Sequence, residues 1–135
     1  MIANKVFVGY DTREDIAYQV CEHSIWQHNK DIEVVPLKQQ ELRDNKLYWR
    51  GEDKLASTEF TFTRFLIPHL MNYEGWALFC DSDIVFLEDV DNLFALRDDK
   101  YAVMCVQHDY NPKPGTKMDG QIQTQYPRKN WSSVV

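Results

Sequence analysis

The sequence has few of the residues that indicate secreted, zinc-binding or membrane-spanning proteins. Its three cysteines, Cys21, Cys80 and Cys105, lie far apart and are odd in number. We interpret them as buried free thiols in a reducing cytosol, because a disulfide framework or a zinc site needs paired or clustered cysteines. No apolar run approaches the roughly 20 residues of a membrane span, and residues 1–5 show no signal-peptide pattern. We therefore expect a cytoplasmic protein without a transmembrane segment, and a peripheral association with membranes stays open.

Positive charge is also scarce. The 15 Lys and Arg residues are outnumbered by 21 Asp and Glu residues, which gives a net charge of -6. This balance argues against a nucleic-acid partner, although an acidic protein can bind a phosphorylated ligand when a metal ion supplies the positive charge. A hydrophobic fraction of 44% indicates a globular chain. Its length predicts a single domain over residues 1–135.

Short apolar runs alternate with helical patterns along the chain. Residues 5–10 and 32–37 are typical of strands, and between them Thr12 and Asp15 approximate a capping box before an amphipathic helix that ends near His28. This βαβ unit predicts a parallel sheet with a right-handed crossover, and hence an α/β fold. From residue 38 to residue 80 we expect a loop with one helical turn (38–55), a helix that Pro68 kinks or restarts (57–71) and a strand (76–80). Beyond it we expect a short helix (92–96), a strand (101–106), a surface loop or lid (107–128) and the beginning of a strand (130–135).

The most informative stretch joins two apolar runs through Asp81-Ser82-Asp83. A buried strand ends at Cys80, and side chains two residues apart in an extended chain point the same way, so both carboxylates face one place. Two carboxylates aimed at one point favour a hard divalent cation such as Mg²⁺ or Mn²⁺, with substrate phosphate completing the coordination. The alternative is that both aspartates only cap the turn that follows the strand.

A second group of candidate residues follows the first predicted strand. In parallel α/β sheets, ligands bind outside the carboxyl ends of the strands. Gly9, Tyr10 and Asp11 lie at such an end, as do the two aspartates, so both groups can face one crevice. The alternative is that Tyr10 and Asp11 form an ordinary turn.

The pattern around these residues resembles a known family. Residues 62–68 (Phe-Thr-Arg-Phe-Leu-Ile-Pro), residues 76–90 with their Asp-Ser-Asp, and Leu93-Phe94 are similar to the glycogenin- and galactosyltransferase-like family 8 of nucleotide-sugar glycosyltransferases. The resemblance implies the GT-A fold, a Rossmann-like α/β fold whose central sheet is mostly parallel and flanked by helices. It also implies transfer of a sugar from a nucleotide-diphosphate donor, by family analogy a UDP-sugar, to a hydroxyl of a saccharide or glycolipid acceptor.

The same resemblance implies roles for individual residues. Asp81 and Asp83, with Ser82 between them, would hold Mn²⁺ or Mg²⁺ on the donor diphosphate, and Arg64 would lie near the phosphates or bond the aspartates. Gly9, Tyr10 and Asp11 would line the base pocket, with Tyr10 able to stack. The family takes a further metal ligand, usually His, from a region beyond Val135, so we expect a fold truncated at its C-terminus or a minimal form with impaired metal binding. The resemblance identifies no general base.

Two other functions fit parts of the sequence. A module that binds a nucleotide sugar without transferring it would have the same donor site. Residues 81–85 also fit the first motif of haloacid dehalogenase-type phosphatases, but in those enzymes the motif follows the first strand, whereas here it lies past the middle of the chain. An unpaired last strand would allow pairing with a second copy, so an oligomer stays open.

Overall fold

The computed structural model describes residues 4–107, 115–116, 122–123 and 131–135. At its centre is a sheet of three parallel strands in the order β2-β1-β3: β1 (Lys5–Gly9), β2 (Glu33–Leu37) and β3 (Ala77–Cys80). All three begin and end nearly level, with Phe7 opposite Val35 on one side and Phe79 on the other. Apolar, largely β-branched or aromatic side chains suit a buried parallel strand. The α/β fold with a parallel sheet is therefore confirmed, and so are these three strands.

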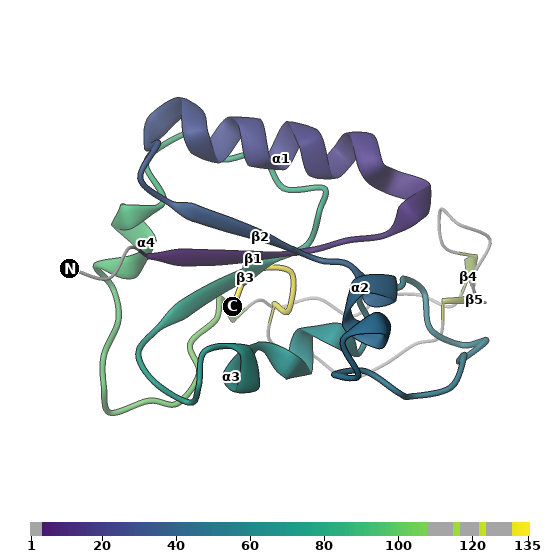
Figure 1. Cartoon of the computed structure of the whole chain (residues 1–135). Coiled ribbons are helices and arrows are strands. Elements are labelled where there is room, and N and C mark those ends of the chain that lie inside the picture. The colour runs from purple at the N-terminus through teal and green to yellow at the C-terminus, as the bar shows by residue number, and fades with distance from the viewer. Residues whose placement is uncertain (1–3, 108–114, 117–121, 124–130) are drawn as a thin grey trace.

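Helix α1 (Asp15–His28) covers one face of the sheet and connects β1 to β2 (Figure 1). Cys21 and Ile25 of α1 are fully buried against Val6 and Val8 of β1. A 3₁₀ turn, η1 (Thr12–Glu14), precedes α1, and the cap is Asp11, whose side chain accepts a hydrogen bond from the Arg13 backbone N–H. The capping box predicted at Thr12 and Asp15 is therefore wrong.

The opposite face of the sheet packs against the residues between β2 and β3 (Figure 1). Its core consists of Phe7, Leu37, Phe60 and Phe79. This connection holds α2 (Gln39–Asp44), the 3₁₀ helix η2 (Thr63–Leu66) and α3 (Ile67–Leu70). The helix predicted over 57–71 is thus present only in its second half, because the Thr61 hydroxyl bonds the hydroxyl, the N–H and the carbonyl oxygen of Thr58, a local alternative to helix.

The last residues of the chain pair with β3. Val134 forms an antiparallel bridge with Cys80, and Phe79 and Val135 exchange backbone hydrogen bonds of 2.7 and 2.9 Å. Of the strand predicted over 130–135, the described residues 131–135 form only this isolated bridge and its flanking hydrogen bonds, on the edge of β3 that faces away from β1.

Two other predictions fail in this region. Residues 101–106 do not form a strand, and Tyr101 and Val103 are 57% and 67% exposed, because no neighbouring strand in the described part of the chain covers this apolar run. Cys105 is exposed rather than buried, whereas Cys21 and Cys80 are buried with their sulfurs 3.8 Å apart.

The remaining elements complete the described structure. Helix α4 (Asp91–Phe94) begins one residue before the predicted short helix. The predicted loop or lid over 107–128 lies mostly outside the described residues; within it, β4 (Gly115–Thr116) pairs antiparallel with β5 (Ile122–Gln123). None of the helices in the described ranges is long and apolar enough to cross a membrane.

Candidate functional site

Asp81 and Asp83 follow β3 directly, at the carboxyl edge of the sheet. The Asp81 N–H donates to Ser133 O at 2.9 Å, so the terminal segment fixes the backbone at this position. The Asp81 side chain is 27% exposed, whereas Asp83 is exposed. The pKa of Asp81 is raised to about 6, mainly because the carboxyl is buried; the charge of Arg64 opposes this shift and the charge of Asp83 adds to it. The site therefore concentrates negative charge that is only partly compensated.

Arg64 lies beside Asp81. Its guanidinium is 3.5 Å from Asp81 Oδ1 and donates to Ser132 O at 3.1 Å. The same guanidinium lies 4.6 Å from the centre of the Phe79 ring, and burial lowers its pKa. The resemblance implied that Arg64 lies near the donor phosphates or bonds the aspartates. The structure shows a contact of the second kind, with Asp81. Arg64 thereby links η2, β3 and the terminal segment.

Gly9 ends β1 beneath an aromatic ring. A Cβ added to Gly9 would lie 2.4 Å from the Phe60 side chain. Glycine is therefore required at this position for the Phe60 ring to cross the end of the strand. This side of Gly9 is closed, so its contribution to a binding pocket is to shape the turn that follows it.

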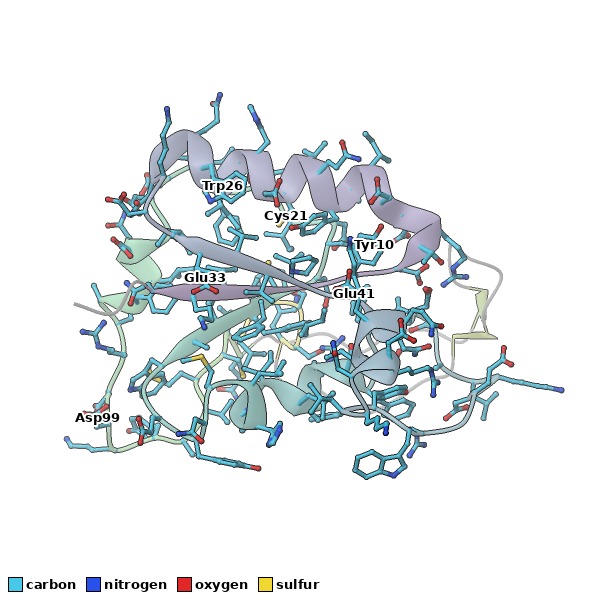
Figure 2. The ribbon with its side chains drawn as sticks, in the orientation of Figure 1. Tyr10, Cys21, Trp26, Glu33, Glu41 and Asp99 are labelled. Carbon is cyan, nitrogen blue, oxygen red and sulfur yellow. The ribbon has the colours of Figure 1, made fainter. Side chains whose placement is uncertain are left out.

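Tyr10 is half-buried at the same edge, next to α2 and near Glu41 (Figure 2). Its hydroxyl donates to Asp15, and this bond is the main reason that its pKa is raised. The Lys38 ammonium lies 5.1 Å from the centre of its ring, and the ring of Tyr18 meets it edge-on at 5.5 Å. Tyr10 is thus a fixed aromatic group with a cation beside it.

Asp11 is buried, with both oxygens bonded to protein groups. The Arg13 side chain donates to its two oxygens at 3.0 and 2.7 Å, and the Glu59 N–H donates at 3.2 Å. The hydrogen bond from Arg13 lowers the pKa of Asp11, although burial opposes it. Asp11 therefore holds the turn after β1 against the loop before η2.

Glu59 completes this connection and was not found from the sequence. Its carboxylate accepts hydrogen bonds from the Thr12 N–H at 3.2 Å and from the Thr12 hydroxyl at 2.9 Å. Together with the bond from the Glu59 N–H to Asp11, these contacts clamp two segments 47 residues apart. No local pattern indicates such a pairing, because a lone glutamate before an aromatic residue is common.

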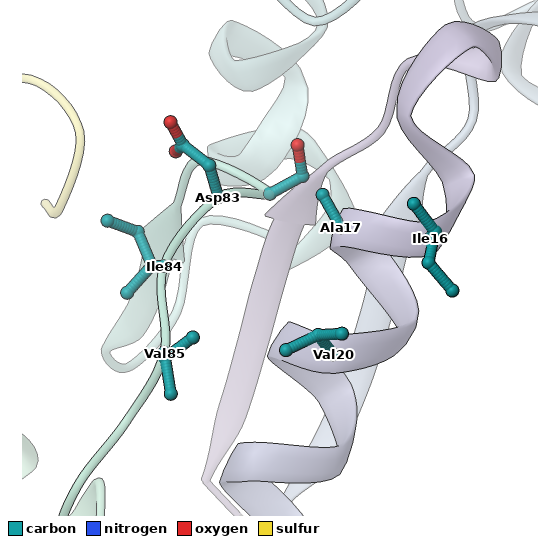
Figure 3. Close-up of a pocket in the computed structure, with 7 residues that line it drawn as sticks. Ile16, Ala17, Val20, Asp83, Ile84 and Val85 are labelled. Carbon is teal, nitrogen blue, oxygen red and sulfur yellow. The ribbon is translucent and has the colours of Figure 1, made fainter.

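A groove lies on the other side of the aspartates. It has a volume of about 260 Å³ and runs between residues 82–85 and α1, with Asp83 at its rim (Figure 3). Ile16, Ala17 and Val20 line the α1 side, and Ile84 and Val85 line the other. Ser82 also lines the groove; it is 1% exposed, and its hydroxyl has no hydrogen-bond partner among the described residues. The groove is mainly apolar and adjoins the charged site.

The donor set at the aspartates suits a hard divalent cation. Burial and the charge of Asp83 disfavour the ionised form of Asp81. A cation between the two carboxylates would offset both the cost of burying this charge and its repulsion from Asp83. Within the described ranges no group of three or more His, Cys, Asp or Glu side chains comes together. The described site would therefore supply two carboxylate ligands, and phosphate oxygens or water would complete the coordination.

Comparison with known proteins identifies the family of this chain. The model of glycosyl transferase family 8 matches residues 11–133. Protein CDI of Arabidopsis thaliana is 59% identical over 132 residues, a match that covers 97% of this chain and 51% of that protein. The chain thus spans about half of the length of this curated relative. No solved structure matches this chain.

Proposed function

This chain belongs to glycosyl transferase family 8, and we propose that it binds a nucleotide-diphosphate sugar, with UDP as the nucleotide, for metal-dependent transfer of the sugar to a hydroxyl group. The observation that supports this proposal is the meeting of two candidate groups at one sheet edge. β1 and β3 are adjacent and parallel, so Tyr10 and the aspartates Asp81 and Asp83 leave the sheet at the same end. Ligands of open α/β sheets bind at this end.

Asp81 and Asp83 would hold Mn²⁺ or Mg²⁺, with the buried Ser82 between them. When bound, the metal would stabilise the negative charge that develops on the leaving diphosphate. Arg64 keeps positive charge next to Asp81, which favours the ionised carboxylate that a metal requires. Burial has the opposite effect, because it favours the protonated form of Asp81. Metal binding would therefore be coupled to deprotonation of Asp81.

Tyr10 would stack on the base of the nucleotide. Its ring is fixed by Asp15 and Tyr18, so little freedom remains to be lost on binding. The Lys38 ammonium, which lies over the ring at 5.1 Å from its centre, is positioned to attract the negative charge of the ligand. Gly9 and Asp11 would act indirectly, by shaping the turn that carries Tyr10.

The acceptor would be a saccharide or a glycolipid. We place the reaction in the cytoplasm, with which the unlinked Cys21 and Cys80 thiols agree. Because the chain spans about half of its curated relative, transfer itself remains part of the proposal. The second candidate is donor binding without transfer, which is favoured by the two-carboxylate site of the described residues. The family match supports a transferase over a phosphatase.

Calorimetric titration of UDP, with and without Mn²⁺, tests the donor site. We expect UDP to bind only with Mn²⁺, and Asp83→Ala to abolish binding. Glu74→Ala, which removes an exposed carboxylate from the turn after α3, should leave binding unchanged. Equal binding with and without Mn²⁺, or by Asp83→Ala and the unchanged chain, would contradict the proposal.

The same preparations separate transfer from binding alone. Slow Mn²⁺-dependent release of the sugar from a UDP-sugar, measured as free UDP, would support a catalytic donor site. Tight Mn²⁺-dependent binding without any release would support the second candidate.

A further inference from the structure

The segment after Asp83 has the side-chain pattern of a strand but belongs to no sheet. Ile84 and Phe86 pack against the core next to α1, whereas Val85 and Leu87 are 55% and 82% exposed. This alternation is the pattern of an extended chain with one covered face. Residues 84–87 are nevertheless outside every strand of the described structure.

The backbone of this segment also has few hydrogen-bond partners among the described residues. Within the described part of the chain, its one backbone hydrogen bond joins the Phe86 N–H to Ser24 Oγ at 3.0 Å. An extended segment with unpaired N–H and C=O groups can accept another extended chain. A lipid could cover the apolar side chains but could not pair with this backbone.

Helix α1 supplies a second apolar wall. Ile16 and Val20 are one helical turn apart and are 70% and 48% exposed, so they form a strip along α1. Figure 3 shows Val20 across the groove from Val85. Contiguous apolar surface of this kind commonly marks an interaction site, and the unpartnered Ser82 hydroxyl in the groove lining offers a buried polar contact as well.

We propose that this groove docks an apolar, extended polypeptide segment, supplied in longer relatives by the part of the protein outside the match. Protein CDI has about as much sequence outside the matched stretch as within it, since the match covers 51% of that protein. The groove, lined by Ile16, Ala17, Val20, Ile84 and Val85, begins at Asp83, so the docked segment would lie next to the proposed donor site.

Thiol accessibility tests the proposal. Cys105→Ser first removes the exposed native thiol. Val85→Cys then places a reporter in the groove, and Leu55→Cys, at a position 90% exposed and outside the groove, is the matched control. Each reporter is alkylated with iodoacetamide in two proteins: this 135-residue chain, and Protein CDI in which this chain replaces the matched stretch.

We expect alkylation of Val85→Cys to be at least tenfold slower in the longer protein, and alkylation of Leu55→Cys to be equally fast in both. Equal rates for Val85→Cys would overturn the proposal, and so would an equal slowing of both reporters. Slow alkylation of Val85→Cys in the 135-residue chain alone would also overturn it, because a second copy or the chain itself would then cover the groove; light scattering distinguishes these two causes.

A second measurement does not need the longer protein. Val85→Asp and Ile16→Asp change exposed side chains, so circular dichroism should show an unchanged fold. If the groove is open in this chain, each variant should lower the fluorescence of the apolar dye ANS at least twofold, and Leu55→Asp should not. An unchanged signal would contradict an open apolar groove. Binding to phosphatidylcholine vesicles that disappears in Val85→Asp would overturn the polypeptide occupant in favour of a lipid.

Discussion

The Phe60 ring lies across Gly9 so closely that a Cβ on Gly9 would be 2.4 Å from it. Phe60 belongs to the core that also contains Phe7 and Phe79, so the ring cannot withdraw without opening that core. The contact therefore joins the end of β1, from which Tyr10 projects, to the loop that leads to Arg64.

Gly9→Ala should destabilise the protein by about 1–3 kcal/mol, the usual result of forcing an extra carbon into a packed core. Urea unfolding followed by circular dichroism measures the loss. Gly51→Ala is the matched control, because a Cβ there meets no atom within 4 Å. Adding Phe60→Leu to Gly9→Ala should recover part of the loss. Equal stability of Gly9→Ala and Gly51→Ala would show that the ring is not held against the strand.

Asp81→Asn should stabilise the metal-free protein while removing metal-dependent donor binding. The pKa of Asp81 is raised from 3.8 to about 6, so its ionised form destabilises the folded state above pH 6. As pH falls from 6 to 4 the folded protein takes up this proton and the penalty disappears. We therefore expect a gain of about 1–2 kcal/mol at pH 7 that fades towards pH 4.

Chemical denaturation at several pH values measures this difference. Asp31→Asn, which changes an exposed side chain away from the site, is the control and should change stability little. A loss of stability at pH 7 in Asp81→Asn would mean that the contact with Arg64 outweighs the cost of burying the charge.

Asp11 should show the opposite pH dependence. Its pKa is lowered below 3.8 by the bond from Arg13, so its contribution to stability is present above that pH and is lost as pH falls through the lower folded-state pKa. Asp11→Asn should cost about 1–3 kcal/mol at pH 7 because it weakens buried charge-assisted bonds. The cost should shrink below pH 4, whereas the exposed Asp31→Asn should cost little throughout. A cost independent of pH would show that shape rather than charge matters at Asp11.

The three thiols should differ in reactivity. Cys105 is exposed, whereas Cys21 and Cys80 are buried, and the pKa of Cys80 is raised because of its contact with Cys21 and its burial. A thiol reagent such as DTNB should therefore modify one cysteine rapidly and the other two only on unfolding. Mass spectrometry of the modified peptides identifies each site. Rapid modification of Cys80 in the folded protein would contradict its placement in the core.

The sequence predicted the parts of the fold that depend on local patterns. β1, β2 and β3 each contain a contiguous apolar run, and α1 has an amphipathic pattern. Asp81 and Asp83 are two residues apart directly after a strand. Residues 101–106 have the same apolar character, yet they form no strand in the described structure. An apolar run shows that a segment can be buried, but it does not show whether a neighbouring strand is present.

Contacts between distant segments could not be predicted. The ring of Phe60 over Gly9, the bonds from Thr12 to Glu59 and the bond from Arg64 to Ser132 each join residues far apart in the sequence. Each involves a common residue type whose partner is set by the packing of the whole chain. The sequence therefore indicated which residues surround the candidate site but not which of them hold its backbone in place.

Electron paramagnetic resonance of Mn²⁺ tests the central claim most directly. Free Mn²⁺ gives a sharp signal that decreases on binding, so the signal can be followed as protein is added in the presence of UDP. We predict that the unchanged chain and Glu74→Ala each lower the signal of free Mn²⁺ well below its value with UDP alone. With Asp83→Ala, the signal should stay at its value with UDP alone. Equal loss of signal with Asp83→Ala would contradict a donor site built on Asp81 and Asp83.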